Sequence, residues 1–355
     1  MTVAFYAPLK APDHPVPSGD RTMARALIKA LEYAEFPITV ASDLRIYDRT
    51  GDTAAQTELI KQADTEVTRI VSGPGARTWR CWLTYHNYYK APDLIGPAVA
   101  RALDIPYVQV ESTRARKRLT GPWARFAEAA EAASDQAHTI FYVTGRDAET
   151  LRRDAPTGQV LTHLRPFLDR ADLPTQSDYN GGMLSVGMMR GGDKLGSYTL
   201  IADTLALLDA GLDWQLTIAG DGPAEAEVTR LMAPFGARVR MLGALPAEEL
   251  QQHYERARLL FWPGVNEAFG YAYLEAQATG LPVVAQDRPG VRDVVAGMQP
   301  AVSDGPHAMA ARLTDMLTDR AALKHLGTQA RARVSQQHLL PAAAATLRTA
   351  IKGMT

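Results

Sequence analysis

The chain has 355 residues, of which 46% are hydrophobic, 22% charged and 7% aromatic. This composition excludes a disordered chain, a collagen and a disulfide scaffold, and the length favours two domains over one. Lys and Arg number 38 against 39 Asp and Glu, a net charge of -1. A generic nucleic-acid binder is disfavoured, because phosphate binding needs a basic excess or a basic face.

The single cysteine, Cys81, cannot form an internal disulfide and is typical of a reducing compartment. Its surroundings predict a half-buried strand residue rather than a nucleophile. No stretch reaches the ~18 apolar residues of a membrane span. Residues 1–9 lack the charged and apolar regions of a signal peptide. We therefore expect a cytoplasmic protein.

The first half of the chain alternates short apolar runs with helical patterns. Residues 18–20 (Ser-Gly-Asp) have turn and N-cap chemistry, and apolar residues then recur at helical spacing from Met23 to Ala34. This rhythm predicts a mostly parallel sheet with helices on both faces. The predicted strands are residues 2–6, 37–41, 69–71, 82–85, 106–110 and 140–143, and further helices are predicted at 94–103 and 146–153.

Residues 172–182 (DLPTQSDYNGG) are polar and carry a Pro and a Gly pair, which predicts a linker. A second strand–helix series follows. We predict a first domain over residues 1–172, with the C-terminal helix of residues 341–355 packing back on it, and a second domain over residues 183–340. In the second domain the predicted strands are residues 183–187, 214–219, 239–242, 259–262 and 282–285, and the predicted helices are 197–209, 224–233, 246–257 and 270–279.

The segment 259–295 is the most informative of the chain. Glu267 precedes a predicted helix that starts at Gly270, and Glu275 lies two turns into it. A helix start offers free N–H groups and a positive dipole end, which suit a diphosphate. The flanking carboxylates suit hydroxyl groups, as acidic residues do for ribose in dinucleotide folds. The pattern indicates a sugar nucleotide, although a solvated carboxylate and an ordinary surface helix residue explain the spacing equally well.

This segment resembles the family 4 retaining glycosyltransferases, which have the GT-B fold. The resemblance rests on residues 267–275 (EAFGYAYLE) and 276–284 (AQATGLPVV), and on the strand-and-turn segments 216–223 and 239–244. It covers the second domain almost throughout and the first domain only in the order of its elements. It implies an α/β protein of two Rossmann-like parallel-sheet domains facing a central cleft.

The resemblance also implies roles for individual residues. Glu275 would hold the ribose hydroxyls of the donor nucleotide, and Glu267 would bind hydroxyls of the transferred sugar. Backbone groups at residues 269–271 would face the diphosphate, and those near Gly243 would face the base. A Gly-containing loop of the first domain, at Gly19, would approach the donor phosphate. The expected donor-binding residues are therefore Gly19, Gly243, Ala244, Phe269, Gly270, Tyr271 and Glu275.

A second loop of the family carries an Arg and a Lys that neutralise the donor diphosphate. Residues 185–196 (SVGMMRGGDKLG) resemble this loop, and Lys194 matches the family lysine. The family arginine follows the first glycine directly, where this chain has Met188. Arg190, two positions later in a longer loop, is expected to substitute for it, with a solvated loop charge as the alternative.

In the first domain, His86 stands after a predicted strand, where the family has a histidine that faces the cleft. It could hydrogen-bond the sugar or a developing charge; a structural histidine is the alternative. The expected catalytic residues are therefore His86, Glu267, Lys194 and Arg190. Gly19 belongs to the loop expected near the donor phosphate, with a simple N-cap at residues 18–20 as the alternative.

The implied activity is that of a hexosyltransferase that moves a sugar from a nucleotide-diphosphate sugar, UDP-sugar favoured, to a hydroxyl acceptor with retention. No Asp-x-Asp motif occurs in the chain, so no metal and no other cofactor is expected. Two alternatives remain: a sugar-nucleotide epimerase on the same fold, and a non-catalytic sugar-nucleotide-binding protein, which the Met188 departure favours. The missing G-x-G-x-x-G after the first strand disfavours a dehydrogenase.

The acceptor is the least defined partner. Residues 112–125 (STRARKRLTGPWAR) contain five Arg or Lys, no acidic residue, and Trp123. Such a segment can dock an anionic membrane surface or hold an anionic acceptor, and a solvated loop is an equal alternative. The expected partners are a nucleotide-sugar donor and a lipid or saccharide acceptor, without nucleic acid. Peripheral contact with the inner membrane face would run through residues 112–125.

Overall fold

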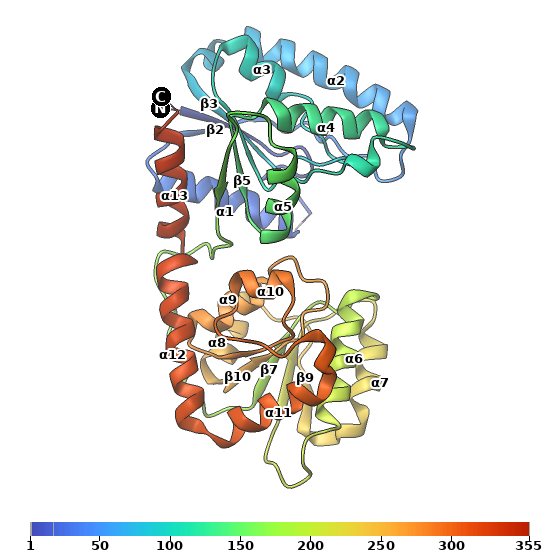
Figure 1. Ribbon diagram of the computed structural model, residues 1–355, viewed down its shortest axis with the longest axis vertical. Coiled ribbons are helices and arrows are strands. Elements are labelled where there is room, and N and C mark those ends of the chain that lie inside the picture. Colours follow the sequence, from blue (N-terminus) through green and yellow to red (C-terminus); the bar gives the residue numbers. More distant parts are fainter. Residues whose placement is uncertain (1, 17, 355) are drawn as a thin grey trace. The chain divides into compact units, whose positions relative to one another are not determined.

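The computed structural model describes residues 2–16 and 18–354, and the chain divides into two compact units. Unit 1 comprises Met1–Arg165 and Leu340–Thr355, and unit 2 comprises Pro166–Leu339. Both are α/β structures built on a wholly parallel sheet (Figure 1). The predicted fold class of two parallel-sheet domains is confirmed.

Unit 1 has a six-stranded sheet of order β2-β1-β3-β4-β5-β6. Helices α2, α3 and α4 cover one face, and α1 and α13 lie on the other (Figure 1). Its strands are β1 (Thr2–Tyr6), β2 (Ile38–Ser42), β3 (Trp79–Tyr85), β4 (Tyr107–Val110), β5 (Thr139–Tyr142) and β6 (Val160–His163). Its helices are α1 (Gly19–Tyr33), α2 (Thr53–Ser72), α3 (Gly96–Leu103), α4 (Ala124–Gln136), α5 (Gly145–Asp154) and α13 (Leu340–Lys352), with 3-10 helices at Pro74–Thr78 and Arg116–Arg118.

Unit 2 has a five-stranded sheet of order β11-β10-β7-β8-β9. Its strands are β7 (Met183–Val186), β8 (Leu216–Ala219), β9 (Val239–Met241), β10 (Leu259–Phe261) and β11 (Val283–Val284). Its helices are α6 (Asp193–Leu205), α7 (Glu225–Met232), α8 (Ala247–Arg256), α9 (Tyr271–Ala278), α10 (Pro289–Val294), α11 (Gly305–Thr318) and α12 (Arg320–Gln337), with 3-10 helices at Ala233–Arg238 and Val302–Asp304.

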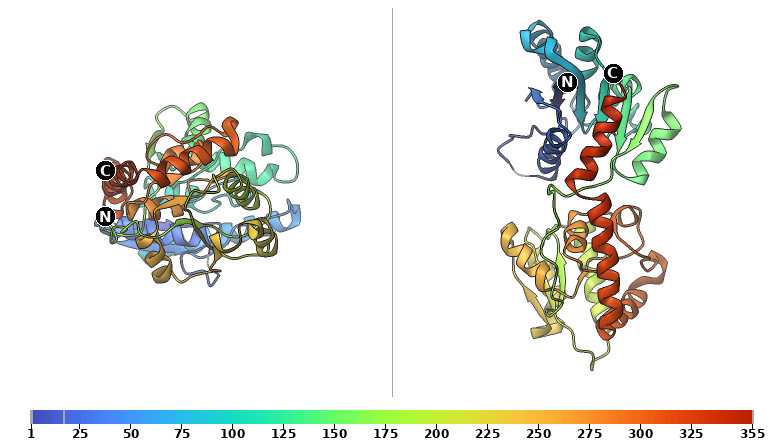
Figure 2. Two further views of the ribbon diagram at one scale, coloured as in Figure 1. Left: turned by 90° about the horizontal axis from the view of Figure 1, so that it is seen from below. Right: turned by 90° about the vertical axis from the view of Figure 1, so that its left-hand side faces the viewer.

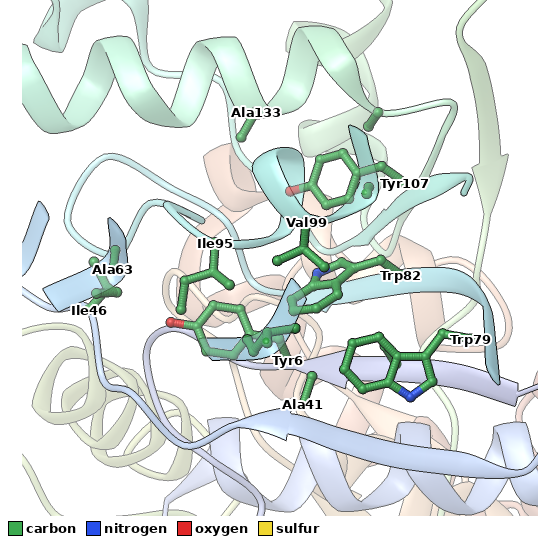
Figure 3. Close-up of a cluster of buried hydrophobic side chains, with 14 of the residues drawn as sticks. Tyr6, Ala41, Ile46, Ala63, Trp79, Trp82, Ile95, Val99, Tyr107 and Ala133 are labelled. Atoms are coloured by element: carbon green, nitrogen blue, oxygen red, sulfur yellow. The ribbon is translucent and has the colours of Figure 1, made fainter. Parts of the chain in front are cut away.

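An aromatic cluster fills the core of unit 1 between its sheet and helices α2 to α4 (Figure 3). Tyr6 and Trp82 lie on neighbouring strands with ring centroids 6.2 Å apart, and Trp79 meets Trp82 edge-on at 5.9 Å. The indole N–H of Trp82 donates to Thr84 at 2.8 Å, and the hydroxyls of Thr84 and Tyr107 donate to the buried carboxylate of Asp93. This network fixes Asp93, near the end of the segment between β3 and α3.

The predicted strand at residues 69–71 is wrong, because these residues form the last turn of α2. Ile70 and Val71 are β-branched and so suggest a strand. However, Ile60, Ala63 and Val67 precede Ile70 at helical spacing and pack on the same core cluster. No helix is predicted from the sequence before residue 69 in this region, nor at α4, α11 or α12.

The polar segment 172–182 lies within unit 2, so the division falls before it. The Ser177 hydroxyl donates to the Ala257 carbonyl at 2.6 Å, and the Tyr179 hydroxyl donates to the Gly280 carbonyl at 2.9 Å. The segment is therefore packed on unit 2 rather than a free linker. Its polar composition reflects hydrogen bonds to loop carbonyls.

The C-terminal helix α13 belongs to unit 1 although it follows unit 2 in the chain. It packs against α1, and Leu347 and Ile351 are fully buried. Figures 1 and 2 show the start of β1 and the end of α13 on the same side of unit 1. The prediction that this helix packs back on the first domain is confirmed.

Cys81 lies in β3 as predicted, but it is fully buried rather than half-buried. Burial raises the pKa of its thiol to about 12. The thiolate is thus scarce at neutral pH, which removes Cys81 as a nucleophile.

Candidate functional site

The strand order of unit 2 defines where a ligand can bind. From β7 the chain proceeds to β8 and β9 on one side of the sheet, and then crosses to β10 and β11 on the other. The switch point between β7 and β10 is the position at which open parallel sheets bind their ligands. Lys194 follows β7, and Glu267 follows β10.

The structure brings these two predicted residues into contact. The Lys194 ammonium forms a short ion pair with Glu267 Oε1, which also accepts the indole N–H of Trp262 at 2.9 Å. The ammonium lies 5.3 Å from the centroid of the Trp262 ring. An ammonium has three donors, so this contact leaves Lys194 with donors for a phosphate oxygen. Trp262 was not predicted, although it ends an apolar run next to the motif.

The loop between β7 and α6 is held by unusually close backbone contacts. A Cβ at Gly220 would lie 1.9 Å from the Gly187 carbonyl oxygen, and one at Gly222 would lie 2.4 Å from that of Met189. The Met189 N–H donates to the Asp221 carbonyl at 2.6 Å, and its side chain is fully buried. The loop therefore has a defined path up to Met189.

The two residues around Met189 project outward. Met188 is 50% exposed, where the family would have its arginine. Arg190 is also exposed, and its side chain makes no hydrogen bond or ion pair within the described part of the chain. The structure thus joins Lys194 to Glu267 but does not bring Arg190 into this contact.

Helix α9 starts at Tyr271, four residues after Glu267, with Gly270 as its N-cap. Gly270 has φ +67°, a conformation that favours glycine, and a Cβ there would lie 2.8 Å from the Tyr273 ring. The rings of Phe269 and Tyr271 meet edge-on at 5.1 Å on either side of Gly270. The Tyr273 hydroxyl donates to the Trp262 carbonyl at 3.0 Å, which ties the helix start to the end of β10.

Glu275 lies in the second turn of α9 and is half-buried. Its Oε2 accepts the Tyr254 hydroxyl at 3.0 Å. Burial raises the pKa of this carboxyl group, while the Tyr254 hydrogen bond and the charge of Arg170 partly oppose the rise. A carboxylate has about four acceptor positions, so Glu275 retains capacity for two hydroxyls of a diol.

Gly243 and Ala244 follow β9 at the same edge of the sheet. Gly243 has φ +69°, and a Cβ at this position would contact nothing within 4 Å. Its carbonyl accepts the Gly220 N–H at 2.8 Å. The backbone at this position is thus fixed, and packing within the chain leaves space beside it.

Unit 1 has a comparable switch point between β1 and β3. His86 follows β3 with φ +68°, and its Nδ1 lies 3.0 Å from Oδ1 of Asp20, in the first turn of α1. Ser18 is the N-cap of that helix, which agrees with the alternative interpretation of residues 18–20 as a simple N-cap. Gly19 is exposed, and a Cβ there would contact nothing within 4 Å, so packing does not require a glycine.

The charges of two further carboxylates act on His86. Burial alone lowers the pKa of His86, but the Asp20 hydrogen bond and the charges of Glu111 and Asp147 outweigh it and raise the pKa. Burial raises the pKa of both Glu111 and Asp147. Sequence reasoning missed these two residues, although both follow carboxyl ends of parallel strands, β4 and β5, where site residues concentrate.

The basic segment 112–125 is folded onto unit 1. Arg114 is buried and pairs with Glu131 at 2.9 Å and Asp135 at 2.6 Å. Arg116 lies 3.4 Å from Asp154, and Arg125 donates to the Thr57 hydroxyl at 2.8 Å. Three of its five cations thus form ion pairs or hydrogen bonds within the unit.

Two α/β units with wholly parallel sheets, each with its candidate residues at the switch point, define the GT-B class of glycosyltransferase fold. Residues 182–319 match the family described as Glycosyl transferases group 1. The matched region contains Lys194, Glu267 and Glu275, together with Gly243 and Gly270.

Sequence relatives agree with this family. The chain is 41% identical over 106 residues to a D-inositol 3-phosphate glycosyltransferase of Corynebacterium urealyticum, a match that covers 28% of this chain and 25% of that protein. It is 25% identical over 225 residues to an alpha-D-kanosaminyltransferase of Streptomyces kanamyceticus, covering 59% of this chain and 58% of that protein. The chain thus spans only part of the length of these curated relatives.

Solved structures agree with the fold over the whole chain. Anabaena HepE in complex with UDP matches with a TM-score of 0.72 at 14% identity, covering 99% of this chain and 100% of that one. The lipopolysaccharide outer core galactosyltransferase WaaB matches with a TM-score of 0.69 at 14% identity, covering both chains fully. Among the described residues, no helix has the length and apolar composition to cross a membrane.

Proposed function

We propose that this protein transfers a sugar from a nucleotide-diphosphate sugar to a hydroxyl acceptor. The observation that carries the proposal is the contact of Lys194 with Glu267 at the switch point of the group 1 domain. A cation for the diphosphate and a carboxylate for the sugar hydroxyls stand side by side there. Relatives named as glycosyltransferases support the same activity.

The proposed roles follow from the chemistry of each group. Lys194 stabilises the negative charge that grows on the leaving phosphate, together with the backbone N–H groups at the start of α9. Glu267 holds hydroxyls of the transferred sugar, and Glu275 holds the ribose. Arg190 is exposed in the loop before α6, and we propose that it adds a second cation when donor binds.

The proposed reaction retains the configuration of the anomeric carbon. The bond from that carbon to the phosphate oxygen breaks, and a bond to the acceptor oxygen forms on the same face. The acceptor proton passes to the leaving phosphate oxygen, so no protein nucleophile is needed. UDP is the proposed nucleotide, since HepE is known in complexes with UDP and with UDP-glucose. The proposal includes no metal, because Lys194 and the helix start would supply the positive charge.

Thermal stability in the presence of UDP-sugars and GDP-sugars, with Mg²⁺ or with EDTA, tests this proposal. A donor at ~100 times its Kd should stabilise the protein by about 2.7 kcal/mol. We expect stabilisation by a UDP-sugar in EDTA, its loss in Glu275→Ala, and no effect of Glu248→Ala, an exposed control on α8.

The same experiment, combined with product analysis of the incubated donors, separates the alternatives. No stabilisation by any donor, or a strict Mg²⁺ requirement, would contradict the proposal. Formation of an epimeric nucleotide sugar without an acceptor would indicate an epimerase. Donor binding without turnover for any acceptor would indicate a non-catalytic binding protein.

A further inference from the structure

A row of aromatic rings leads from His86 to the basic segment of unit 1. His86 stacks on Tyr88 with centroids 4.8 Å apart and an interplanar angle of 27°. Tyr88 meets Tyr89 edge-on at 5.7 Å, and Tyr89 meets Trp123 edge-on at 5.9 Å. All four side chains are half-buried, so each is partly open to solvent. A sugar ring can pack its apolar face on such rings.

Two cations lie over the far end of this row. The Lys90 ammonium is 5.8 Å from the Tyr89 centroid and 5.1 Å from that of Trp123. The Arg118 guanidinium carbon is 5.0 Å and 5.5 Å from the same two centroids. Both cations therefore share one aromatic pair, and the ring faces compensate only part of their charge.

Among the residues that the structure describes, no carboxylate pairs with these cations. Neither side chain makes an ion pair or hydrogen bond in the described structure, and Nε of Arg118 is buried without a partner. Asp48, whose backbone carbonyl accepts the Trp123 indole N–H at 3.2 Å, is already engaged through its carboxylate. It accepts from Gln56 at 2.7 Å and from the Thr50 and Gly51 N–H groups. A buried guanidinium N–H without an acceptor is costly unless a ligand supplies one.

The cations are presented by ordered backbone. Tyr89 and Lys90 form the tip of a tight turn closed by paired hydrogen bonds between Tyr88 and Ala91. The Lys90 carbonyl accepts the Asp48 N–H at 2.9 Å. Buried Asn87 anchors the turn to α4 by donating to the Ala130 carbonyl at 3.0 Å. A preorganised site loses less conformational entropy when a ligand binds.

We propose that Lys90 and Arg118, over Tyr89 and Trp123, bind an anionic oxygen group of the acceptor, a phosphate or a carboxylate. The aromatic row would hold the acceptor's sugar or polyol ring, with its anionic group at the end away from His86. This inference rests on the proposed function, because only a glycosyl transfer has an acceptor. It defines the class of acceptor: a phosphorylated or acidic sugar or polyol, free or as part of a lipid headgroup.

Calorimetric titration of the full chain with glucose 6-phosphate, glucuronate and glucose tests the proposal. We expect the two anionic sugars to bind at millimolar concentration or below, more weakly at high salt, and glucose to bind far less. The double variant Lys90→Gln/Arg118→Gln should lose at least about tenfold in affinity for the anionic sugars. Lys117→Gln is the matched control, since Lys117 is an exposed cation of the same segment without a partner in the described structure.

Several outcomes would overturn the proposal: no binding of either anionic sugar, equal binding of glucose, or unchanged affinity in the double variant. Binding confined to phosphatidylglycerol vesicles, and lost equally in Lys117→Gln, would assign the segment to a membrane surface instead. If the double variant has a lowered melting temperature, the single variant Lys90→Gln replaces it in the test, because the Lys90 side chain makes no hydrogen bond in the described structure. UDP-sugar affinity, measured in parallel, reports on unit 2 and separates failure of this inference from failure of the proposed function.

Discussion

Asp20 controls the charge of His86 in unit 1. The two side chains are 3.0 Å apart, and the hydrogen bond lowers the pKa of Asp20 while it raises that of His86. Two more carboxylates, Glu111 and Asp147, act on the same imidazole. His86 is therefore held more protonated than a free histidine, which supports the prediction that it hydrogen-bonds the sugar or a developing charge.

Asp20→Asn should lower the pKa of His86, because the substitution removes the hydrogen-bonding charge. The folded-state pKa of His86 lies above its ordinary value of 6.5, so the pair stabilises the protein fully below that pH. This contribution is lost as the pH rises through the raised folded pKa. NMR titration of the His86 ring protons measures both effects, with Asp13→Asn, an exposed carboxylate in the loop before α1, as the control. An unchanged titration midpoint in Asp20→Asn would show that the pair does not set the pKa.

Lys194→Ala should lower kcat/KM by about 10²–10³, the usual cost of removing one charge-stabilising group. The effect should appear in donor hydrolysis, measured as UDP release, and so does not depend on knowing the acceptor. Lys324→Ala removes an exposed lysine of α12 and should leave the rate unchanged. Equal rates for Lys194→Ala and the parent protein would exclude the diphosphate role.

At the scale of elements, the backbone contacts of β7 and β8 position the loop between β7 and α6. The Gly187 N–H donates to the Ala219 carbonyl at 3.1 Å, and the Tyr198 hydroxyl donates to the Gly187 carbonyl at 2.7 Å. Gly187 also lies against Trp262, since a Cβ there would be 2.6 Å from its ring. The loop that leads to Lys194 is thus packed on both β8 and the residue that follows β10.

Gly220→Ala should destabilise unit 2 by about 2 kcal/mol or more, because overpacking and backbone strain add. Its φ is +143°, and the new Cβ would lie 1.9 Å from the Gly187 carbonyl oxygen. Gly191→Ala, where a Cβ would contact nothing within 4 Å, is the control in the loop itself. Urea unfolding measures the free energy of unfolding of both variants. A Gly220→Ala protein as stable as Gly191→Ala would contradict the close approach of Gly220 to the Gly187 carbonyl.

At the scale of the whole molecule, the chain returns to unit 1 after completing unit 2. Helix α13 supplies buried side chains to a unit whose sheet ends at β6, 177 residues before the helix starts. The stability of unit 1 thus depends on the last part of the chain. Trp79, Trp82 and Trp123 report on unit 1, and Trp214 and Trp262 on unit 2.

Leu347→Ala should destabilise unit 1 by about 2–5 kcal/mol, the usual cost of truncating a fully buried leucine. Thr349→Ala, on the exposed side of α13, should have little effect. Denaturant unfolding is followed by tryptophan fluorescence in variants that keep only the tryptophans of one unit. It shows which unit loses stability. A loss confined to the unit 2 tryptophans would contradict the packing of α13 on unit 1.

Residues of the candidate site could be predicted from the sequence where they lie close together along the chain. Glu267, Gly270 and Glu275 lie within nine residues, on one strand–loop–helix segment, so their pattern is visible in the sequence alone. Trp262 and Tyr254 could not be predicted in the same way, because their hydrogen bonds depend on how β10 and α8 pack. The prediction of a linker at residues 172–182 is wrong, since composition does not reveal the carbonyls that its side chains contact.

The sequence by itself determined the alternation of strands and helices, the two α/β domains and the local motif around α9, because these depend on residue periodicity and short spacing. Only the tertiary structure decided which distant groups meet: Lys194 with Glu267, 73 residues apart, and His86 with Asp20, 66 residues apart. The physical reason is the strand order of a parallel sheet. Each crossover sets strands side by side that are remote in sequence, and charges then interact according to their distance in space.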